Sequence, residues 1–529
     1  SGGLGFAIYN RGIRRGIAFS HVISSGNEAH LGALDYVDYL LDDPEVGAFI
    51  LLLEQVRNAP YLLEVADKAA ALGKPLIVAK FGRSEAARRG ALSHTGSMTG
   101  AEYAYDAVFK HAGIIRAEDQ DELLDISAAF TSCPLPKGNN IGIVTISGGV
   151  GVWLSDVCAQ HGMQVPELAD DVQDDLRRFI PDYGGVSNPV DITAQAIELG
   201  GNISAIELMY DSPQIDSVAV VTSLAEETMV TAEKGDLARI QARQEKPLFY
   251  YSYTLPCDAA VGHLAGAGVQ CYTSLQGCIR ALKLLGEYRA FLDLRIADKP
   301  LEDIDIPMLA GEDKIFTEWS AAPYLAVLGI KIPAAKLVGS AEEAVIAAQK
   351  FGAPVALKAQ SPQLPHKAAA GGVILDVEGD WAVRRAYEQV STLPVDISLD
   401  GVLVQKMAPK GIEMIVGIAE DEAFGPLVMI GFGGTGVELQ KDVAWAPAPF
   451  GLVRAEALIR SLRGAPRLDG SVRARPADIG ALAHLLAVLS LFADHNSGRI
   501  AELDLNPVVL YQKGDGLVVL DSLIVMRKY

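Results

Sequence analysis

The sequence predicts an α/β protein built from doubly wound parallel sheets. Short apolar runs rich in β-branched residues, such as 48–53 and 76–79, alternate along the chain with helical patterns. Runs that are apolar throughout are typical of strands buried on both faces, as parallel strands are. Glycine-containing turns follow several of these runs, at the carboxyl ends of strands where ligands of open α/β sheets bind.

The length, net charge and hydrophobic pattern of the chain limit its possible functions. A chain of 529 residues is too long for one hydrophobic core, so three or four domains are expected. Its 66 acidic and 45 basic residues give a net charge of 45 − 66 = −21, which argues against a nucleic-acid or anionic-membrane surface. A local basic pocket could still bind a nucleotide. No apolar run reaches the ~18 residues of a membrane span, and the start does not resemble a signal peptide.

The cysteines also indicate the compartment. They show no CxxC spacing, so we expect reduced thiols of a cytoplasmic protein and neither disulfides nor a zinc site. The five are Cys133, Cys158, Cys257, Cys271 and Cys278.

The first third of the chain opens on Ser1-Gly2-Gly3 and a helix through Asn10, and a glycine-rich helix start offers free N–H groups to an anion. Gly16–Ser24 is strand-like and leads to a polar turn at 25–27. The remaining elements expected here are helices at 30–41 and 61–72, strands at 48–53 and 76–79, and a helix over 101–131.

The segment 80–100 (KFGRSEAARRGALSHTGSMTG) carries the most distinctive chemistry. His94 lies between glycines, which allow a change of backbone shape, and beyond a cluster of arginines suited to phosphate. We therefore hypothesise that His94 carries a phosphoryl group; the alternative is a surface loop with an incidental histidine. Glu54 ends the strand 48–53 and could approach His94, unless it is simply a solvated acid.

A second unit follows the Pro- and Gly-containing segment 132–140. A strand at 141–146 leads directly into Ser147-Gly148-Gly149-Val150-Gly151 and a helix to about His161, an arrangement that favours anion binding. The glycine spacing is not GxGxxG, so no dinucleotide site is predicted, and a close-packed turn without ligand is the alternative. Further elements expected are a long loop at 183–193, strands at 217–222 and 247–251, and a helix at 278–294.

The acidic segment 298–313 has no apolar period and two prolines, so it is expected to be an interdomain linker. A third unit follows it, with Ser340 as the N-cap and Glu343 at the capping-box position of one helix. Its expected elements are helices at 317–328 and 340–350, strands at 355–358, 401–407 and 426–430, and a final strand pair at 500–510 and 516–525.

The third unit predicts an ATP–Mg²⁺ site without a Walker A motif. Lys358 would contact phosphates, and the loop with Lys367, Gly371 and Gly372 would cover them. Asn506 and Asp521 would offer the oxygen ligands that Mg²⁺ requires; a purely structural acid–amide hairpin is the alternative. The strand backbone from Gln405 to Met407 would edge the adenine, and Glu413 would face either the ribose or a nearby lysine.

The order of these motifs resembles the ADP-forming (NDP-forming) acyl-CoA synthetases, the superfamily that includes succinyl-CoA synthetase, over essentially the whole chain. The matching strings are SGGLG, SSGN, LLLE, KFGRSE…SHTGS, ISGGVG, SNPVDIT, SPQLPHKAAAGGV, VQKMAPKGIE, GFGGTGVELQKD and LDLNPVV. The resemblance implies two flavodoxin-like doubly wound ligase domains followed by an ATP-grasp module. The expected boundaries are 1–131 and 138–295 for the ligase domains, 296–313 for the linker and 314–529 for the ATP-grasp domain.

The resemblance also implies a reaction: a carboxylic acid, CoA and ATP give acyl-CoA, ADP and phosphate through acyl-phosphate and phosphohistidine intermediates. His94 matches the phosphohistidine, Glu54 the carboxylate that stabilises it, and His366 a second histidine that relays phosphate. The helix starts at Ser1, Gly2 and Gly3 and at Ser147, Gly148 and Gly149 match those that hold the phosphoryl group. The implied cofactors and substrates are ATP/ADP, Mg²⁺ and CoA.

Two departures qualify the resemblance. Family members carry an N-terminal CoA-binding domain before the SGGLG motif, so we expect that domain to have been removed from this chain or to come from a partner. The flap reads PHKAAAGGV, where relatives often have an acidic or hydroxyl residue after the lysine. A homodimer is the other assembly expected.

Several alternatives stay open on the sequence. Gly26 and Asn27 could line the acyl pocket, but their composition does not set its size, so the acid could be aromatic, as in feruloyl-CoA synthetases. Other classes are a regulatory protein that keeps the scaffold without ligase chemistry, and an ATP-grasp carboxylate–amine ligase, which would not need His94. A preference for ADP or GDP is not encoded in any motif found.

Overall fold

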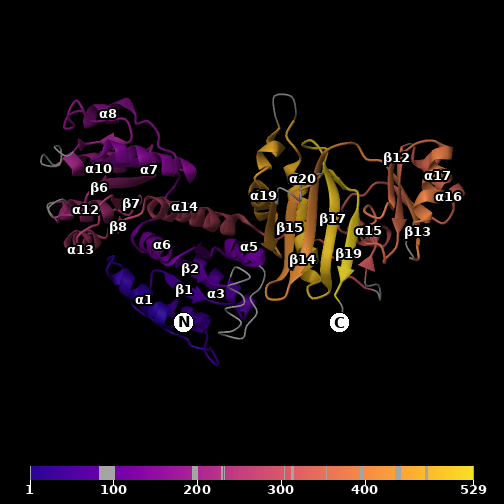
Figure 1. Ribbon diagram of the computed structural model, residues 1–529, viewed down its shortest axis with the longest axis horizontal. Coiled ribbons are helices and arrows are strands. Elements are labelled where there is room, and N and C mark those ends of the chain that lie inside the picture. The colour runs from indigo at the N-terminus through magenta and orange to yellow at the C-terminus, as the bar shows by residue number, and fades with distance from the viewer. Residues whose placement is uncertain are drawn as a thin grey trace. The chain divides into compact units, whose positions relative to one another are not determined.

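The computed structural model describes residues 2–82, 102–193, 201–227, 230, 233–302, 304–310, 315–352, 354–393, 397–434, 442–470 and 475–527. By their internal contacts the residues form two compact units. The first comprises 1–99 and 109–293, and the second comprises 100–108 and 294–529. Figure 1 shows the elements of each unit, which are described separately below.

The first unit begins with a parallel sheet in the order β1-β2-β3. All five residues of β2 are buried, as expected of a strand covered on both faces. The side chain of Asn58 accepts a hydrogen bond from the N–H of Tyr61 and so caps the helix between β1 and β2. The elements are α1 (Gly2–Ile13), α2 (Ala33–Leu40), β1 (Phe49–Leu53), α3 (Ala59–Ala71), β2 (Leu76–Lys80), α5 (Glu102–Ala112), β3 (Ile115–Ala117) and α6 (Gln120–Ser132). Residues 102–108 of α5 belong to the second unit by their contacts.

Two predictions for this region are wrong. Gly16–Ser24 is not part of any described strand; only Ile17 of this segment is buried, so its other side chains have no core face to pack on. The single helix expected over 101–131 is two helices separated by β3, because Gly113 adopts φ +68° and ends α5. Asp119 then caps α6 by accepting the N–H groups of Asp121 and Glu122.

The second sheet of this unit is parallel in the order β5-β4-β6-β7-β8. The order reverses between β4 and β6, and such a reversal defines a doubly wound fold with a switch point at the carboxyl ends of those strands. The predicted α/β fold is therefore confirmed for this part. Its elements are β4 (Ile141–Thr145), α7 (Gly148–Gln160), α8 (Asp170–Leu176), β5 (Val190–Asp191), α10 (Gly201–Asp211), β6 (Ser217–Thr222), α12 (Lys234–Gln241), β7 (Leu248–Ser252), α13 (Asp258–Gly266), β8 (Gln270–Tyr272) and α14 (Leu275–Ala297).

The second unit contains two sheets whose strand pairs are antiparallel. The smaller sheet has the order β10-β13-β11-β12, and α16 and α17 pack on one face of it (Figure 1). Its elements are β10 (Ala335–Val338), α16 (Ala341–Phe351), β11 (Val355–Gln360), β12 (Val373–Val377), α17 (Asp380–Ser391) and β13 (Gly401–Lys406). Ser340 caps α16 as predicted, by accepting the N–H of Glu343.

The larger sheet runs β16-β15-β14-β17-β19-β9, with β18 paired to β17. The predicted final strand 516–525 is interrupted at Leu520–Asp521, which separates β18 from β19, although the Asp521 carbonyl still accepts the N–H of Asn506 on β17 at 3.2 Å. The elements are β9 (Ile315–Phe316), α15 (Glu318–Val327), β14 (Ile412–Asp421), β15 (Gly425–Phe432), β16 (Val443–Pro447), α19 (Leu452–Arg460), the 3-10 helix η1 (Ala465–Asp469), α20 (Ile479–His495), β17 (Ile500–Leu510), β18 (Leu517–Val519) and β19 (Ser522–Met526).

The described part of 296–313, expected to be a linker, is packed against the core of the second unit. Leu309 is buried there, and its N–H donates to Asn496 Oδ1 at 2.8 Å. Asp298 accepts the backbone N–H groups of Gly451 and Arg454 at 2.9 and 3.0 Å and so satisfies donors at the start of α19. At least one acid of this segment, Asp298, thus stabilises the start of a helix and is not merely solvated.

No helix within the described ranges is both long and apolar enough to cross a lipid bilayer. The five cysteines are free thiols, as the sequence predicted. Burial raises the pKa of Cys133 to about 11 and that of Cys158 to about 12, so these two are packing residues and not reactive thiolates.

Candidate active site

A buried carboxylate, Glu318, is the centre of the polar cluster in the second unit. It is the first residue of α15, directly after the N-cap Thr317, and its side chain is 7% exposed. Its Oε1 accepts Lys358 Nζ at 2.9 Å and its Oε2 accepts Lys367 Nζ at 3.0 Å. The two lysines predicted to bind phosphate are therefore brought together, on one carboxylate that the sequence analysis did not identify.

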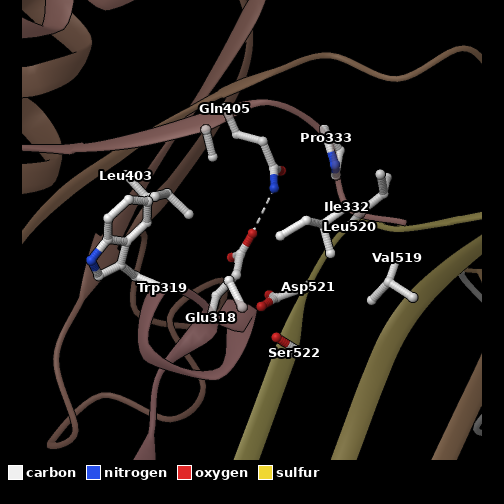
Figure 2. Close-up of a pocket in the computed structure, with 12 residues that line it drawn as sticks. Glu318, Trp319, Ile332, Pro333, Leu403, Gln405, Val519, Leu520, Asp521 and Ser522 are labelled. Carbon is white, nitrogen blue, oxygen red and sulfur yellow. Dashed lines mark hydrogen bonds between the residues drawn. The ribbon is translucent and has the colours of Figure 1, made fainter. Parts of the chain in front are cut away.

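The register of the smaller sheet explains why Lys358 points into this cluster. Its neighbours on β11, Val355 and Leu357, pack into the core formed with α16 and α17. Because side chains alternate along a strand, Lys358 lies on the opposite face. Gln405 on β13 lies on that face too, since Ala356 is its register partner, and it donates from Nε2 to Glu318 Oε1 at 2.8 Å (Figure 2).

Asp521, at the break before β19, is the second carboxylate of the cluster, so Glu318 and Asp521 together pair with the two lysines. Its Oδ1 accepts Lys367 Nζ at 2.5 Å, and Lys358 Nζ also donates to the Leu520 carbonyl at 2.6 Å. Burial raises the pKa of Asp521 to about 6, helped by the charge of Glu318 and opposed by Lys367. Burial acts in the same sense on Glu318, but Lys358 and Lys367 outweigh it and lower its pKa below the ordinary value.

Two cavities adjoin this cluster, and Glu318 and Asp521 line both. The first is largely apolar, with Trp319, Ile332 and Leu403 around the Glu318–Gln405 hydrogen bond, as Figure 2 shows. The second is polar and contains four residues that the sequence predicted for the site. Those four are His366, Lys367, Asn506 and Asp521.

His366 and Asp504 lie together in the polar cavity. Burial and the neighbouring Glu502 raise the pKa of Asp504, while a hydrogen bond from Asn506 and the charge of His366 act to lower it. His366 itself is exposed, on the loop between β11 and β12. A histidine that faces solvent beside a partly buried carboxylate can both accept a group and be held by that carboxylate.

Asn506 and Asp521 fit a magnesium ion by position and donor type. The N–H of Asn506 donates to the Asp521 carbonyl at 3.2 Å, so the two residues are adjacent on β17 and the chain before β19. Their side chains offer a carboxylate and an amide oxygen, which are hard-cation ligands. Within the described ranges no three His, Cys, Asp or Glu side chains gather as a metal site. Any ion here would therefore use few protein ligands, as Mg²⁺ commonly does with nucleotides.

We expect Asp521→Asn to raise the Mg²⁺ concentration needed for half-maximal binding of a non-hydrolysable ATP analogue by roughly tenfold or more, because the amide removes the charged ligand. A titration of Mg²⁺ followed by calorimetry measures this. Asp515→Asn, at an exposed acid of the β17–β18 turn, is the matched control and should leave the titration unchanged. An unaltered Mg²⁺ dependence in Asp521→Asn would remove Asp521 from the metal site.

The other residues predicted for the nucleotide, Gly371, Gly372, Met407 and Glu413, line neither cavity. Gly372 is a packed turn residue whose N–H donates to the Lys367 carbonyl at 2.8 Å, and Gly371 precedes it at φ +74°. Glu413, on β14, is exposed and lines neither cavity. The N–H of Met407 donates to the Pro354 carbonyl at 3.2 Å, so a base at this strand would have to use other groups than that N–H.

In the first unit, Glu54 directly follows β1, as predicted, and is half-buried. Gly148 begins α7, and a Cβ there would come within 2.7 Å of Asp191 Oδ2, the end of a side chain that would have to move to make room. Gly2 and Gly3 begin α1. Asn27, next to Gly26, accepts Arg57 Nη1 through its carbonyl at 3.2 Å. His94 and Ser1 lie outside the described residues.

Sequence reasoning missed Glu318, Asp504 and Trp319. Thr317-Glu318 looked like an ordinary helix start, and an acid in a first turn is commonly explained by the helix dipole alone. The signal that could have marked Glu318 is its place just after a short apolar strand, as the only charged residue of a helix that is otherwise mostly apolar. Asp504 stands two residues from Asn506 and so faces the same side of β17.

The chain thus combines parallel-sheet domains with a two-sheet unit whose paired lysines and acid–amide pair are suited to a polyphosphate and its cation. Comparison with known families agrees. Residues 1–130 match a succinyl-CoA ligase like flavodoxin domain, 141–243 a ligase-CoA domain and 307–526 an ATP-grasp domain. The predicted fold class, two flavodoxin-like CoA-ligase domains followed by an ATP-grasp domain, is confirmed.

The chain belongs to the ADP-forming acyl-CoA synthetase family, and it is an acid–CoA ligase. The trans-feruloyl-CoA synthase FCS1 of an unknown prokaryotic organism is 32% identical over 535 residues, which cover 97% of this chain and 74% of that protein. Acetate–CoA ligase (ADP-forming) I of Archaeoglobus fulgidus is 30% identical over 532 residues, covering 98% and 76%. These two relatives act on different acids, so the family does not identify the acid used here.

Among solved structures, acetyl-coenzyme A synthetase 1 of Candidatus Korarchaeum cryptofilum, in complex with coenzyme A and Ca-AMPCP, is 38% identical. The matched part covers 40% of this chain and 94% of the chain in that structure, with a TM-score of 0.38.

Proposed function

We propose that the chain converts a carboxylic acid, CoA and ATP into acyl-CoA, ADP and phosphate, through an acyl phosphate and a phosphorylated His94. The observation that carries this proposal is the pairing of Lys358 and Lys367 on one carboxylate, beside a polar cavity that Lys367, His366, Asn506 and Asp521 line. A regulatory protein that had lost the ligase reaction would have no need to keep two buried lysines, a metal-type oxygen pair and a histidine together.

The proposed role of each group follows from its surroundings. Lys358 and Lys367 neutralise the nucleotide phosphates as point charges, and phosphoryl transfer depends chiefly on such positioning and charge stabilisation. Asn506 and Asp521 would hold Mg²⁺, which when bound neutralises charge on the phosphates. His366 would take the γ-phosphoryl group on a ring nitrogen as the bond to ADP breaks, with Asp504 steadying the ring.

The transfers after His366 would take place on the first unit. His94 receives the phosphoryl group from His366 and passes it to an oxygen of the substrate carboxylate, so that an acyl phosphate forms. The thiolate of CoA then attacks the acyl carbon and phosphate leaves. Glu54 would fix the imidazole of His94, and the N–H groups at Gly2–Gly3 and Gly148–Gly149 would hold the phosphate.

The acid is proposed only as a class. The relatives named above act on acetate and on a hydroxycinnamate, which span small and aromatic acids. Ferulate and acetate are therefore the first acids to test. The turn at Gly26–Asn27 is the proposed wall of the acyl pocket, and the cytoplasm is the proposed location.

The function is tested by measuring ADP release and acyl-CoA formation with MgATP, CoA and a panel of acids. Acetate, succinate, a branched acid and ferulate should be compared, with the chain alone and with a CoA-binding domain added. We expect equal amounts of ADP and acyl-CoA with at least one acid. Formation of AMP in place of ADP, or no acyl-CoA under any of these conditions, would contradict the proposal.

A further inference from the structure

We propose that Glu318 is a positioning residue that fixes the ammonium groups of Lys358 and Lys367 for the nucleotide polyphosphate and stays bound to both while the nucleotide is present. This inference rests on the proposed function and adds a residue to it. Nothing in the sequence motifs assigns a role to Glu318. Its side chain reaches both predicted phosphate lysines and Gln405 at 2.8 to 3.0 Å.

The donor count of the lysines supports a positioning role. A lysine ammonium group has three N–H donors. Lys358 Nζ uses two of them on Glu318 Oε1 and the Leu520 carbonyl, and Lys367 Nζ uses two on Glu318 Oε2 and Asp521 Oδ1. Each lysine therefore keeps one donor for a phosphate oxygen without breaking its bond to Glu318.

Exposure distinguishes the two carboxylates. Glu318 is 7% exposed and receives three hydrogen bonds, so leaving the lysines would cost a buried carboxylate its partners. Asp521 is 30% exposed and lines the polar cavity beside Asn506. Of the two acids on Lys367, Asp521 is thus the one free to exchange this lysine for a cation, and Glu318 is the permanent one.

A competing role would have the opposite consequence. If Glu318 merely neutralised the lysines until phosphate displaced it, removing its charge would tighten the binding of polyphosphate. If it positions them, the isosteric Glu318→Gln replaces one of the two accepting oxygens by an NH₂ group, so only one of the two ammonium groups keeps an acceptor on this side chain. The two lysines would then no longer be held by one side chain, and the β- and γ-phosphates would add less to the affinity for the nucleotide.

The test compares the binding of AMP and of AMPPNP, a non-hydrolysable ATP analogue, to the full chain by calorimetry in excess Mg²⁺. The ratio of the two Kd values reports what the β- and γ-phosphates add. We expect Glu318→Gln to reduce this ratio at least tenfold, because AMPPNP binding weakens and AMP binding changes little. Glu342→Gln is the matched control, since Glu342 also lies in the first turn of a helix of this unit but is exposed and pairs with Arg384.

An equal loss of affinity for AMP and AMPPNP would mean that Glu318 only supports the fold, and tighter AMPPNP binding would mean that it only competes with phosphate; either result overturns the inference. Circular dichroism checks that the variant folds. If Glu318→Gln does not fold, Glu318→Asp serves instead, because its shorter carboxylate cannot span both lysines. The ratio of the AMP and AMPPNP Kd values should then fall at least threefold, and an unchanged ratio overturns the inference. A wild-type chain that binds neither ligand would contradict the proposed function as well, whereas normal wild-type binding with an unchanged variant ratio contradicts only the role of Glu318.

Discussion

Replacing His94 by alanine is expected to abolish acyl-CoA synthesis, with a loss of at least about 10³-fold in kcat, because the variant has no nitrogen on which to carry the phosphoryl group. The loss should appear with every acid, since the carrier is common to all of them. A coupled assay of ADP release in the presence of CoA and acid measures it. Binding of AMPPNP should be unchanged, because the nucleotide residues lie in the second unit.

His495→Ala is the control for that experiment. His495 is an exposed histidine at the end of α20, away from the residues that line the two cavities, and its loss should leave turnover within about twofold of the wild type. Full acyl-CoA synthesis by His94→Ala would refute a carrier role for this histidine. The SHTGS motif would then have to be explained as a loop of another function.

The second large effect is expected for His366→Ala, and it should depend on direction. Labelling of the chain by γ-labelled MgATP should slow by roughly 10²-fold, because the histidine beside Lys367 and Asp504 can no longer relay the phosphoryl group. Labelling of His94 from the acyl-phosphate side should proceed at the wild-type rate. Rapid quenching at alkaline pH followed by counting of protein-bound phosphate gives both rates.

His484→Ala, at another exposed histidine of α20, provides the comparison for the second experiment and should change neither rate. If His366→Ala lost labelling equally from both directions, His366 would be needed for folding or for His94 itself and not for relay. If labelling by MgATP kept its full rate, phosphate would pass from ATP to His94 without His366.

Much of the fold could be predicted where the chain itself carries the signal. The strand expected at 217–222 is β6 (Ser217–Thr222), because a continuous apolar run between polar turns has no other stable arrangement in a parallel sheet. The helix over 101–131 was wrong because its apolar spacing continues through Ile114 and Ile115, and only the left-handed Gly113 and the ladder to β2 make that part a strand. The pairing of β3 with β2 therefore determines the secondary structure here, and the local sequence pattern does not.

In the site, too, some residues could be predicted from the local sequence and others depend on tertiary contacts. Lys358 and Lys367 could be predicted because a lysine in an apolar strand or before a glycine turn is unusual in its own surroundings. Glu318 could not, since its role comes from contacts to residues 40, 49 and 87 positions away in the chain. A residue whose function depends on partners that distant leaves no local pattern to read.

The most direct test of the phosphohistidine mechanism is the chemistry of the phosphorylated protein. The full chain is incubated with MgATP, the phosphoprotein is divided between acid and base, and the site is located by mass spectrometry at neutral to alkaline pH. We expect phosphate that is labile in acid, stable in base and located on His94, and that is transferred from the protein when a carboxylic acid and CoA are added. Synthesis of acyl-CoA and ADP by a chain that never carries acid-labile phosphate on His94 would contradict the mechanism.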